Sequence, residues 1–196
     1  MRLPSVRATR DERARALPGD ELIPGAAGAF THAISIKAAP EDVWPWLAQM
    51  GAGSRAGWYS YDFIDNGRRP SANRVIAELQ AIEPGTLFPA MPGIVDAFHV
   101  MRVEQGSCLV LGWRPGPGQP PSTTWAFVLE RDAERGTRLI VRVRASPAYR
   151  VFGLPNRIGG ALIRVVHFVM ERKQLIGIRR RAEASRGTAR SRQEAA

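Results

Sequence analysis

Residues 30–50, FTHAISIKAAPEDVWPWLAQM, contain the change of pattern that decides the fold. The first eight residues alternate in polarity, and a period of two is typical of a half-buried strand. From Pro40 onward the spacing is helical, and proline suits the first turn of a helix. The residues on the strand face are Phe30, His32, Ile34 and Ile36, and those at helical spacing are Val43, Trp44, Leu47 and Met50. The stretch predicts a strand that leads directly into a helix.

Four more strand patterns follow, separated mostly by short turns. They are DAFHVMRVE (96–104), SCLVLGWR (107–114), STTWAFVLER (122–131) and TRLIVRVRA (137–145). Strands joined in this way predict an antiparallel meander. The insert RPGPGQPP (114–121) has four prolines without amide donors, so we expect it to loop out at one end of the sheet, where it would rim a cavity mouth.

A long helix is predicted from residue 156 to about 182. One stripe of this helix is apolar and consists of Ile158, Leu162, Val165, Val169 and Ile176. The opposite stripe is polar and consists of Arg157, Arg164, His167, Glu171 and Gln174. We expect the apolar stripe to line the interior, with Val165 and Val169 among the residues that contact a ligand.

The chain of 196 residues, 44% of them apolar, is long enough for one core without disulfides. We expect an N-terminal arm (1–29), a compact domain (30–183) and a basic disordered tail (184–196). Cys108 is the only cysteine, which excludes an intrachain disulfide and metal sites built from several thiolates, and indicates a reducing compartment. Since the N-terminal sequence also lacks the apolar run of a secretory signal, we predict a cytoplasmic protein.

Much of the formal net charge of +10 lies near the C-terminus, where residues 172–192 hold eight Lys or Arg against one Glu. This basic stretch could contact an anionic membrane surface or nucleic acid without specificity, or it could be a solvated tail. The sequence contains no P-loop and no dinucleotide-binding glycine motif, so neither a cofactor nor a specific nucleic-acid partner is expected. The oligomeric state cannot be predicted from these patterns.

Three segments together resemble the SRPBCC superfamily: AISIKAAPEDVWPWLAQMG (33–51), GWYSYD (57–62) and MERKQLIGIRRRAE (170–183). That superfamily includes START-like lipid-transfer domains, polyketide cyclases and birch-pollen-allergen-like proteins. The resemblance implies an α+β helix-grip fold, in which a curved antiparallel sheet wraps around a long C-terminal helix and short helices follow the first strand. The resemblance also implies an internal cavity. Members of the superfamily bind, carry or transform their ligands, so the fold alone does not indicate one function.

Large apolar and amphipathic side chains are the candidates for a cavity wall, because they combine apolar area with a few polar edges that orient a ligand. These candidate ligand-binding residues are Trp46, Met50, Trp58, Tyr61, Trp113, Trp125, Val165 and Val169. Each of them is also compatible with an ordinary place in the core.

The candidate catalytic residues are Tyr61, Asp62, Glu78, His99 and Arg142. Asp62 and Glu78 could act as buried acids or bases. Alternatively, Asp62 could cap the helix or loop that follows it, and Glu78 could pair with a strand arginine such as Arg142. His99 titrates near neutral pH, but it could equally be structural. The three histidines of the chain lie in separate elements, so no metal site is predicted.

Arg138, Arg142 and Arg144 share one face of a predicted strand, and apolar residues occupy the other face. If the apolar face lines the cavity, the three arginines are solvated. If the strand is turned the other way, they could bind a carboxylate or phenolate head group. Parity alone does not orient the strand.

Three functions follow from these observations. The first is binding of a small hydrophobic or amphipathic ligand in the cavity, as a carrier or sensor. The second is a cyclase or dehydratase acting on a polyketide-like compound, which requires at least two proton-transferring groups to converge. The third is a weak peripheral contact with an anionic membrane or nucleic acid through the basic C-terminus.

Overall fold

The computed structural model describes residues 4–93, 96–116, 118–147 and 156–193, with no side-chain description for 156–164 and 188–193. Six strands form one sheet in the order β1-β6-β5-β4-β3-β2, and every neighbouring pair is antiparallel. The strands are β1 (Gly28–Ile36), β2 (Leu87–Pro89), β3 (Ala97–Glu104), β4 (Cys108–Trp113), β5 (Thr123–Asp132) and β6 (Gly136–Ala145). The predicted meander is β3 to β6, and the predicted first strand is β1.

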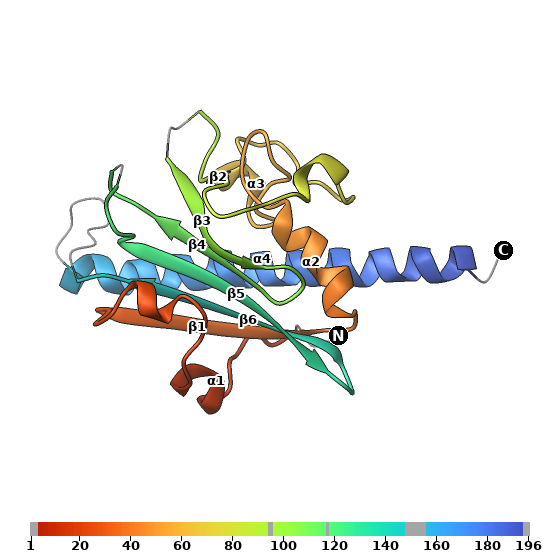
Figure 1. The fold of residues 1–196 in the computed structure, drawn as a ribbon, viewed down its shortest axis with the longest axis horizontal. Coiled ribbons are helices and arrows are strands. Elements are labelled where there is room, and N and C mark those ends of the chain that lie inside the picture. Colours follow the sequence, from red (N-terminus) through yellow and green to blue (C-terminus); the bar gives the residue numbers. More distant parts are fainter. Residues whose placement is uncertain (1–3, 94–95, 117, 148–155, 194–196) are drawn as a thin grey trace.

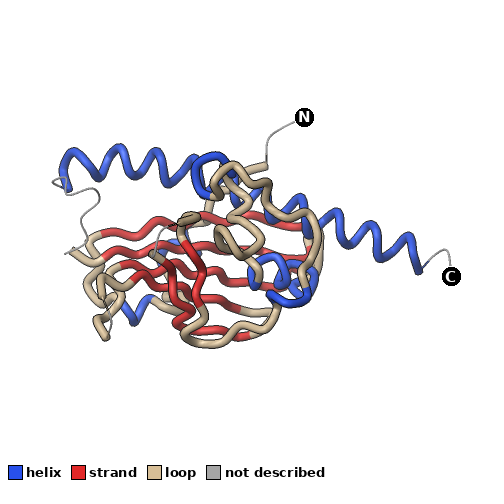
Figure 2. Tube along the Cα trace, turned by 90° about the horizontal axis from the view of Figure 1, so that it is seen from above, coloured by secondary structure: helices blue, strands red, loops and turns tan. Residues whose placement is uncertain are grey.

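Two helices pack against the same face of this sheet, α2 (Pro40–Ala48) and α4 (Asn156–Gln193). Figures 1 and 2 show α4 running along the sheet and extending well beyond it at its C-terminal end. The smaller elements are α1 (Arg10–Ala14), η1 (Asp20–Leu22), α3 (Asp62–Asp65) and η2 (Ala77–Leu79). This arrangement confirms the α+β helix-grip class predicted from the sequence.

The core lies between the inner face of the sheet, α2 and α4. Alternate strand residues supply the sheet's share, for example Ile34 and Ile36 of β1 and Phe127 and Leu129 of β5. From α4 come Leu175, Ile178 and Ala182, all fully buried. A Cβ at Gly177 would lie 2.3 Å from the backbone oxygen of Tyr59, so only glycine allows α4 to approach this loop so closely.

The N-terminal arm covers the outer face of the sheet, where Ala8 and Leu17 pack against Ala33, Val128 and Ile140. The arm also reaches the edge of β1, because the amide of Ala33 donates to the backbone oxygen of Val6 at 3.1 Å. The arm therefore supplies the apolar cover that one face of the sheet would otherwise lack.

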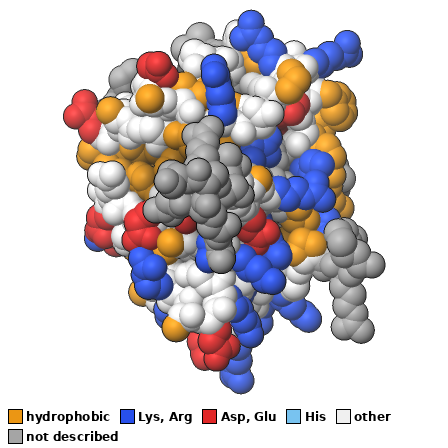
Figure 3. Space-filling view, turned by 90° about the vertical axis from the view of Figure 1, so that its right-hand side faces the viewer, with side chains coloured by type: hydrophobic (Ala, Val, Ile, Leu, Met, Phe, Trp, Pro, Cys, Tyr) orange, Lys and Arg blue, Asp and Glu red, His pale blue; other side chains and the backbone are white. Residues whose placement is uncertain are grey.

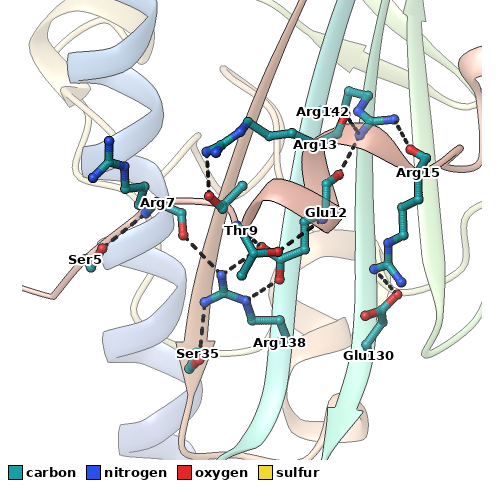
Figure 4. A network of polar contacts seen from close by, with 11 residues as sticks. Ser5, Arg7, Thr9, Glu12, Arg13, Arg15, Ser35, Glu130, Arg138 and Arg142 are labelled. Atoms are coloured by element: carbon teal, nitrogen blue, oxygen red, sulfur yellow. Dashed lines mark hydrogen bonds and ion pairs between the residues drawn. The ribbon is translucent and has the colours of Figure 1, made fainter.

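The three strand arginines lie on this outer face and bind the arm, as Figure 4 shows for Arg138 and Arg142. Arg138 donates to Glu12 at 2.7 Å. Arg142, 3% exposed, donates to the Asp20 carboxylate at 2.6 Å and to the backbone oxygens of Glu12, Arg13 and Arg15 at 2.6, 3.2 and 2.9 Å. These arginines are neither solvated nor turned toward the interior, the two alternatives considered from the sequence. The arm satisfies them instead.

The C-terminal helix is longer than predicted, because α4 continues to Gln193 through the segment expected to be a disordered tail from residue 184. Among the residues that the structure describes, no helix is long and apolar enough to cross a membrane.

We predict that Arg142→Met destabilises the fold by about 3 kcal/mol, because it leaves three backbone oxygens without this donor and removes the shortest contact of the Asp20 carboxylate. Urea unfolding measures the change. Arg131→Met is the matched control, since Arg131 pairs with Glu41 on the surface and its removal is expected to cost about 1 kcal/mol or less. Equal unfolding midpoints for the two variants would show that Arg142 does not hold the arm.

Candidate functional site

Among the described side chains of α4, the inward face matches the apolar stripe expected from the sequence only at Ile176, which is buried in the core. Val165 and Val169 are 62% and 42% exposed, whereas Glu171 and Gln174 are 3% and 2% exposed. Leu175, Ile178 and Ala182 pack on the sheet. Because a helix turns by 100° per residue, residues 167, 171 and 174 lie on the same side of α4 as these three and therefore also face the sheet. The prediction that Val165 and Val169 line the ligand cavity is therefore corrected. Ile158 and Leu162 lie outside the described side chains.

Five polar side chains meet between α4 and the inner face of the sheet, and we call them the interior polar cluster: His32, Trp125, His167, Glu171 and Gln174. His167 Nε2 lies 3.7 Å from Glu171 Oε2, one helical turn away. The His167 ring lies 6.0 Å from the His32 ring of β1. Gln174 Nε2 approaches the sulfur of Met50 at 3.7 Å.

Each member of the cluster has a buried polar atom without a hydrogen-bond partner among the described residues. These atoms are His32 Nδ1, Trp125 Nε1, His167 Nδ1, Glu171 Oε1 and Gln174 Oε1. The Trp125 indole N–H nevertheless lies close enough to Glu171 to lower the pKa of that carboxyl group, so these two groups partly satisfy each other. Buried polar groups in folded proteins nearly always have partners, and an unpaired one costs about 1–3 kcal/mol. Such a concentration of unpaired atoms is typical of a site that receives a polar group from outside the chain.

Burial keeps His167 and Glu171 neutral near pH 7. It raises the pKa of Glu171 to about 8, and the neighbouring Trp125 indole only partly offsets this effect. Burial, with the nearby His32, lowers the pKa of His167 to about 4. The 3.7 Å contact between His167 and Glu171 is therefore a contact of a carboxylic acid with a neutral imidazole rather than an ion pair.

An aromatic wall adjoins the cluster. The Trp125 ring stacks on Trp58 at 5.3 Å and contacts Phe127 at 5.1 Å and Phe98 at 5.7 Å. The Trp58 indole donates to the backbone oxygens of Pro89 and Ala90 at 3.2 and 3.1 Å, so its orientation is fixed.

The other predicted wall residues differ in position. Trp46 and Met50 are fully buried in the same core. Trp113 and Tyr61 are only partly buried, at the end of β4 and just before α3.

The candidate catalytic residues do not converge. Asp62 accepts hydrogen bonds from the backbone amide and the hydroxyl of Ser71, the structural alternative considered for it. Glu78 is exposed in η2. Because Phe98 and Val100 point to the core, His99 between them points to the outer face, where Arg142 also lies.

Trp125 was predicted as a wall residue, and His167, Glu171 and Gln174 were placed on the polar stripe of the helix, but their convergence was not predicted. Their signal in the sequence is the spacing i, i+4, i+7 on one side of the helix. Among the described residues, no group of three or more His, Cys, Asp or Glu could hold a metal ion.

A groove of about 410 Å³ opens beside the cluster, at the edge of the sheet. Residues 4–8 form one wall, Phe168 and Arg172 of α4 form the other, and His32 and Thr31 lie at its base on β1. His32 belongs to both the groove and the cluster, so it connects the two.

No protein-family model matches the chain, and no curated protein matches it. Solved structures of similar fold include the Polyketide_cyc-like protein Cgl2372 of Corynebacterium glutamicum, with 15% identity, TM-score 0.43, and coverage of 83% of this chain and 95% of that one. Another is the Aha1 dimer of Colwellia psychrerythraea, with 16% identity, TM-score 0.40, and coverage of 74% and 93%.

A third similar structure is the di-domain ARO/CYC StfQ of the steffimycin biosynthetic pathway, with 14% identity, TM-score 0.46 and coverage of 81% of this chain. The chain spans about half of StfQ, since 51% of that protein is covered. At these identities and TM-scores the likeness carries no argument about ligand or reaction.

We predict that Glu171→Gln stabilises the fold in alkaline solution and has little effect near pH 4.5. The pKa of Glu171 is raised from 4.5 to about 8 in the folded state, so the wild type loses stability as pH rises through that interval. Glutamine does not ionise, and the variant should gain up to a few kcal/mol at pH 8.5. Thermal unfolding from pH 4.5 to 9 measures this difference. Glu78→Gln controls for the change in charge at an exposed site, and parallel curves for wild type and Glu171→Gln would contradict the burial of this carboxyl group.

Proposed function

We propose that this chain binds a small hydrophobic or amphipathic molecule between the inner face of the sheet and α4. The observation that carries the proposal is the interior polar cluster, five buried polar groups with unpaired atoms beside an aromatic wall. A site of this composition matches the usual make-up of small-molecule pockets, which are mostly apolar with a few polar groups that fix orientation.

The chemistry of the cluster indicates which polar groups the ligand would carry. At neutral pH Glu171 is a carboxylic acid that can donate a hydrogen bond, and the Trp125 indole donates as well. The Gln174 amide oxygen accepts, and each neutral imidazole has one donor and one acceptor nitrogen. A hydroxyl or carbonyl group would therefore pair well, whereas most of the affinity would come from apolar contact with Trp58, Trp125 and Phe127.

An enzyme of the cyclase or dehydratase kind is the second candidate. The pairing of Glu171 with His167 favours it, because the sequence analysis required two proton-transferring groups to converge and these two lie 3.7 Å apart. A carboxyl group with a pKa of about 8 is suited to general acid–base work near neutral pH. Chemical conversion of a bound compound, slowed by Glu171→Gln, would distinguish an enzyme from a carrier.

The basic C-terminus supports a peripheral interaction less well. Several of its arginines are engaged within the chain: Arg179 pairs with Glu183 at 2.9 Å, Arg181 donates to the backbone oxygen of Ala72 at 2.7 Å, and Arg186 donates to that of Lys37 at 2.9 Å. Figure 3, which views the C-terminal end of α4, shows basic, acidic and apolar side chains intermixed rather than a continuous basic surface.

We predict that the chain binds 2-naphthol, an aromatic probe with one hydroxyl group, more tightly than naphthalene. Gln174→Leu should reduce the affinity for 2-naphthol about tenfold, because it removes a polar partner at nearly constant volume, and should leave naphthalene binding unchanged. Equilibrium dialysis of both probes measures the two affinities.

Val169→Ser is the matched control for this test, since Val169 lies on the exposed side of the same helix. Equal losses in the two variants, or no binding of either probe by the wild type, would argue against a ligand site between the sheet and α4.

A further inference from the structure

The groove beside β1 is strongly basic. Its lining includes three guanidinium groups, those of Arg7, Arg13 and Arg172, and no carboxylate appears among the described residues that line it. In Figure 4 the side chains of Arg7 and Arg13 both extend from the arm toward α4, the helix that carries Arg172. Three like charges around one hollow repel each other, so the groove favours an anion.

Two of these arginines are available to such an anion. No hydrogen bond or ion pair within the described residues involves the guanidinium of Arg7 or that of Arg172, whereas Arg13 donates to the backbone oxygen of Ala8 at 2.6 Å. By contrast, the arginines of the outer face, Arg138 and Arg142, are fully engaged with the arm. The groove thus holds two guanidinium groups that have no hydrogen-bond or ion-pair partner among the described residues.

The walls of the groove are held in place before any ligand binds. The backbone of Arg7 bridges to that of His32, and the Arg7 carbonyl accepts from Arg138 at 3.1 Å. The contacts of Arg138 with Glu12 fix the remainder of this arm segment. A preformed site of this kind loses little conformational entropy on binding.

The base of the groove leads to the interior polar cluster. His32 lines the groove and lies 6.0 Å from His167, and Phe168, which lines the opposite wall, lies 5.6 Å from His32. A molecule with an anionic end in the groove could therefore place its uncharged part against these rings.

We propose that this groove is an anion site that binds the carboxylate or phosphate group of an amphipathic ligand, with Arg7 and Arg172 as its principal contacts. Guanidinium groups suit both anions because their planar donors can form two parallel hydrogen bonds. The assignment rests on the proposed function, which accounts for the apolar part of the ligand. It specifies in addition that the ligand carries a negative charge and that this charged group binds in the groove.

Octyl phosphate, 1-octanol and inorganic phosphate are the probes that test this proposal by calorimetric titration of the full chain. Octyl phosphate should bind about 10- to 100-fold more tightly than either of the others, because only this probe engages both parts of the site. Arg7→Gln/Arg172→Gln should bring octyl phosphate to the affinity of octanol while octanol itself is unaffected.

Arg69→Gln/Arg135→Gln is the matched control, because it removes the same charge from two exposed arginines that do not line the groove. An equal loss in this control would overturn the proposal in favour of a general charge effect. If octyl phosphate bound no more tightly than inorganic phosphate, the groove would bind free anions only. The proposal that it binds the charged end of an amphipathic ligand would then be wrong. Absence of octanol and 2-naphthol binding, with phosphate still dependent on Arg7 and Arg172, would instead refute the proposed function alone.

Discussion

The close packing of α4 at Gly177 governs the arrangement of the interior. A Cβ at this position would lie 2.3 Å from the Tyr59 backbone oxygen, and Leu175, Ile178 and Ala182 are buried on the adjoining side of the helix. Together these contacts fix the rotation of α4 about its axis. The rotation buries Glu171 and Gln174, turns the partly buried His167 inward and leaves Val165 and Val169 exposed. Glu171 and Gln174 are thus buried because the C-terminal half of α4 packs on the sheet through the other side chains of the same helix face.

Such an arrangement carries a cost in stability that a purely structural helix would avoid. Burial of unpaired polar atoms opposes folding. The raised pKa of Glu171 reflects the same effect, because burial disfavours the ionised form of its carboxyl group. Functional sites are where proteins commonly retain groups of this kind, because a partner supplied by a ligand recovers part of the lost free energy. The N-terminal arm has a complementary role: it neutralises the arginines of the outer face and forms one wall of the basic groove at the edge of β1.

Periodicity was sufficient to predict β1, β3 to β6 and the long terminal helix, because each of these depends on local spacing. It did not predict β2, whose three residues are too few to show a period. It failed for the inward face of α4, because Val165 and Val169 of the predicted apolar stripe are exposed although Ile176 of the same stripe is buried. Contacts distant in sequence, the packing of Leu175, Ile178 and Ala182 and the close approach at Gly177, decide which side of the helix faces the sheet. It also could not orient the strand that bears Arg142, because the residues that bind this side chain lie more than 100 positions away, in the arm. The interior polar cluster combines α4, β1 and β5 and was therefore not visible as a motif.

The rotation of α4 is tested most directly by the reactivity of single cysteines introduced at Val169 and Gln174 toward a thiol reagent. The background is low, because Cys108 is 1% exposed and burial raises the pKa of its thiol. The account predicts rapid modification of Val169→Cys and at least about tenfold slower modification of Gln174→Cys, with equal rates in urea. Rapid modification of Gln174→Cys together with protection of Val169→Cys in the folded protein would contradict it.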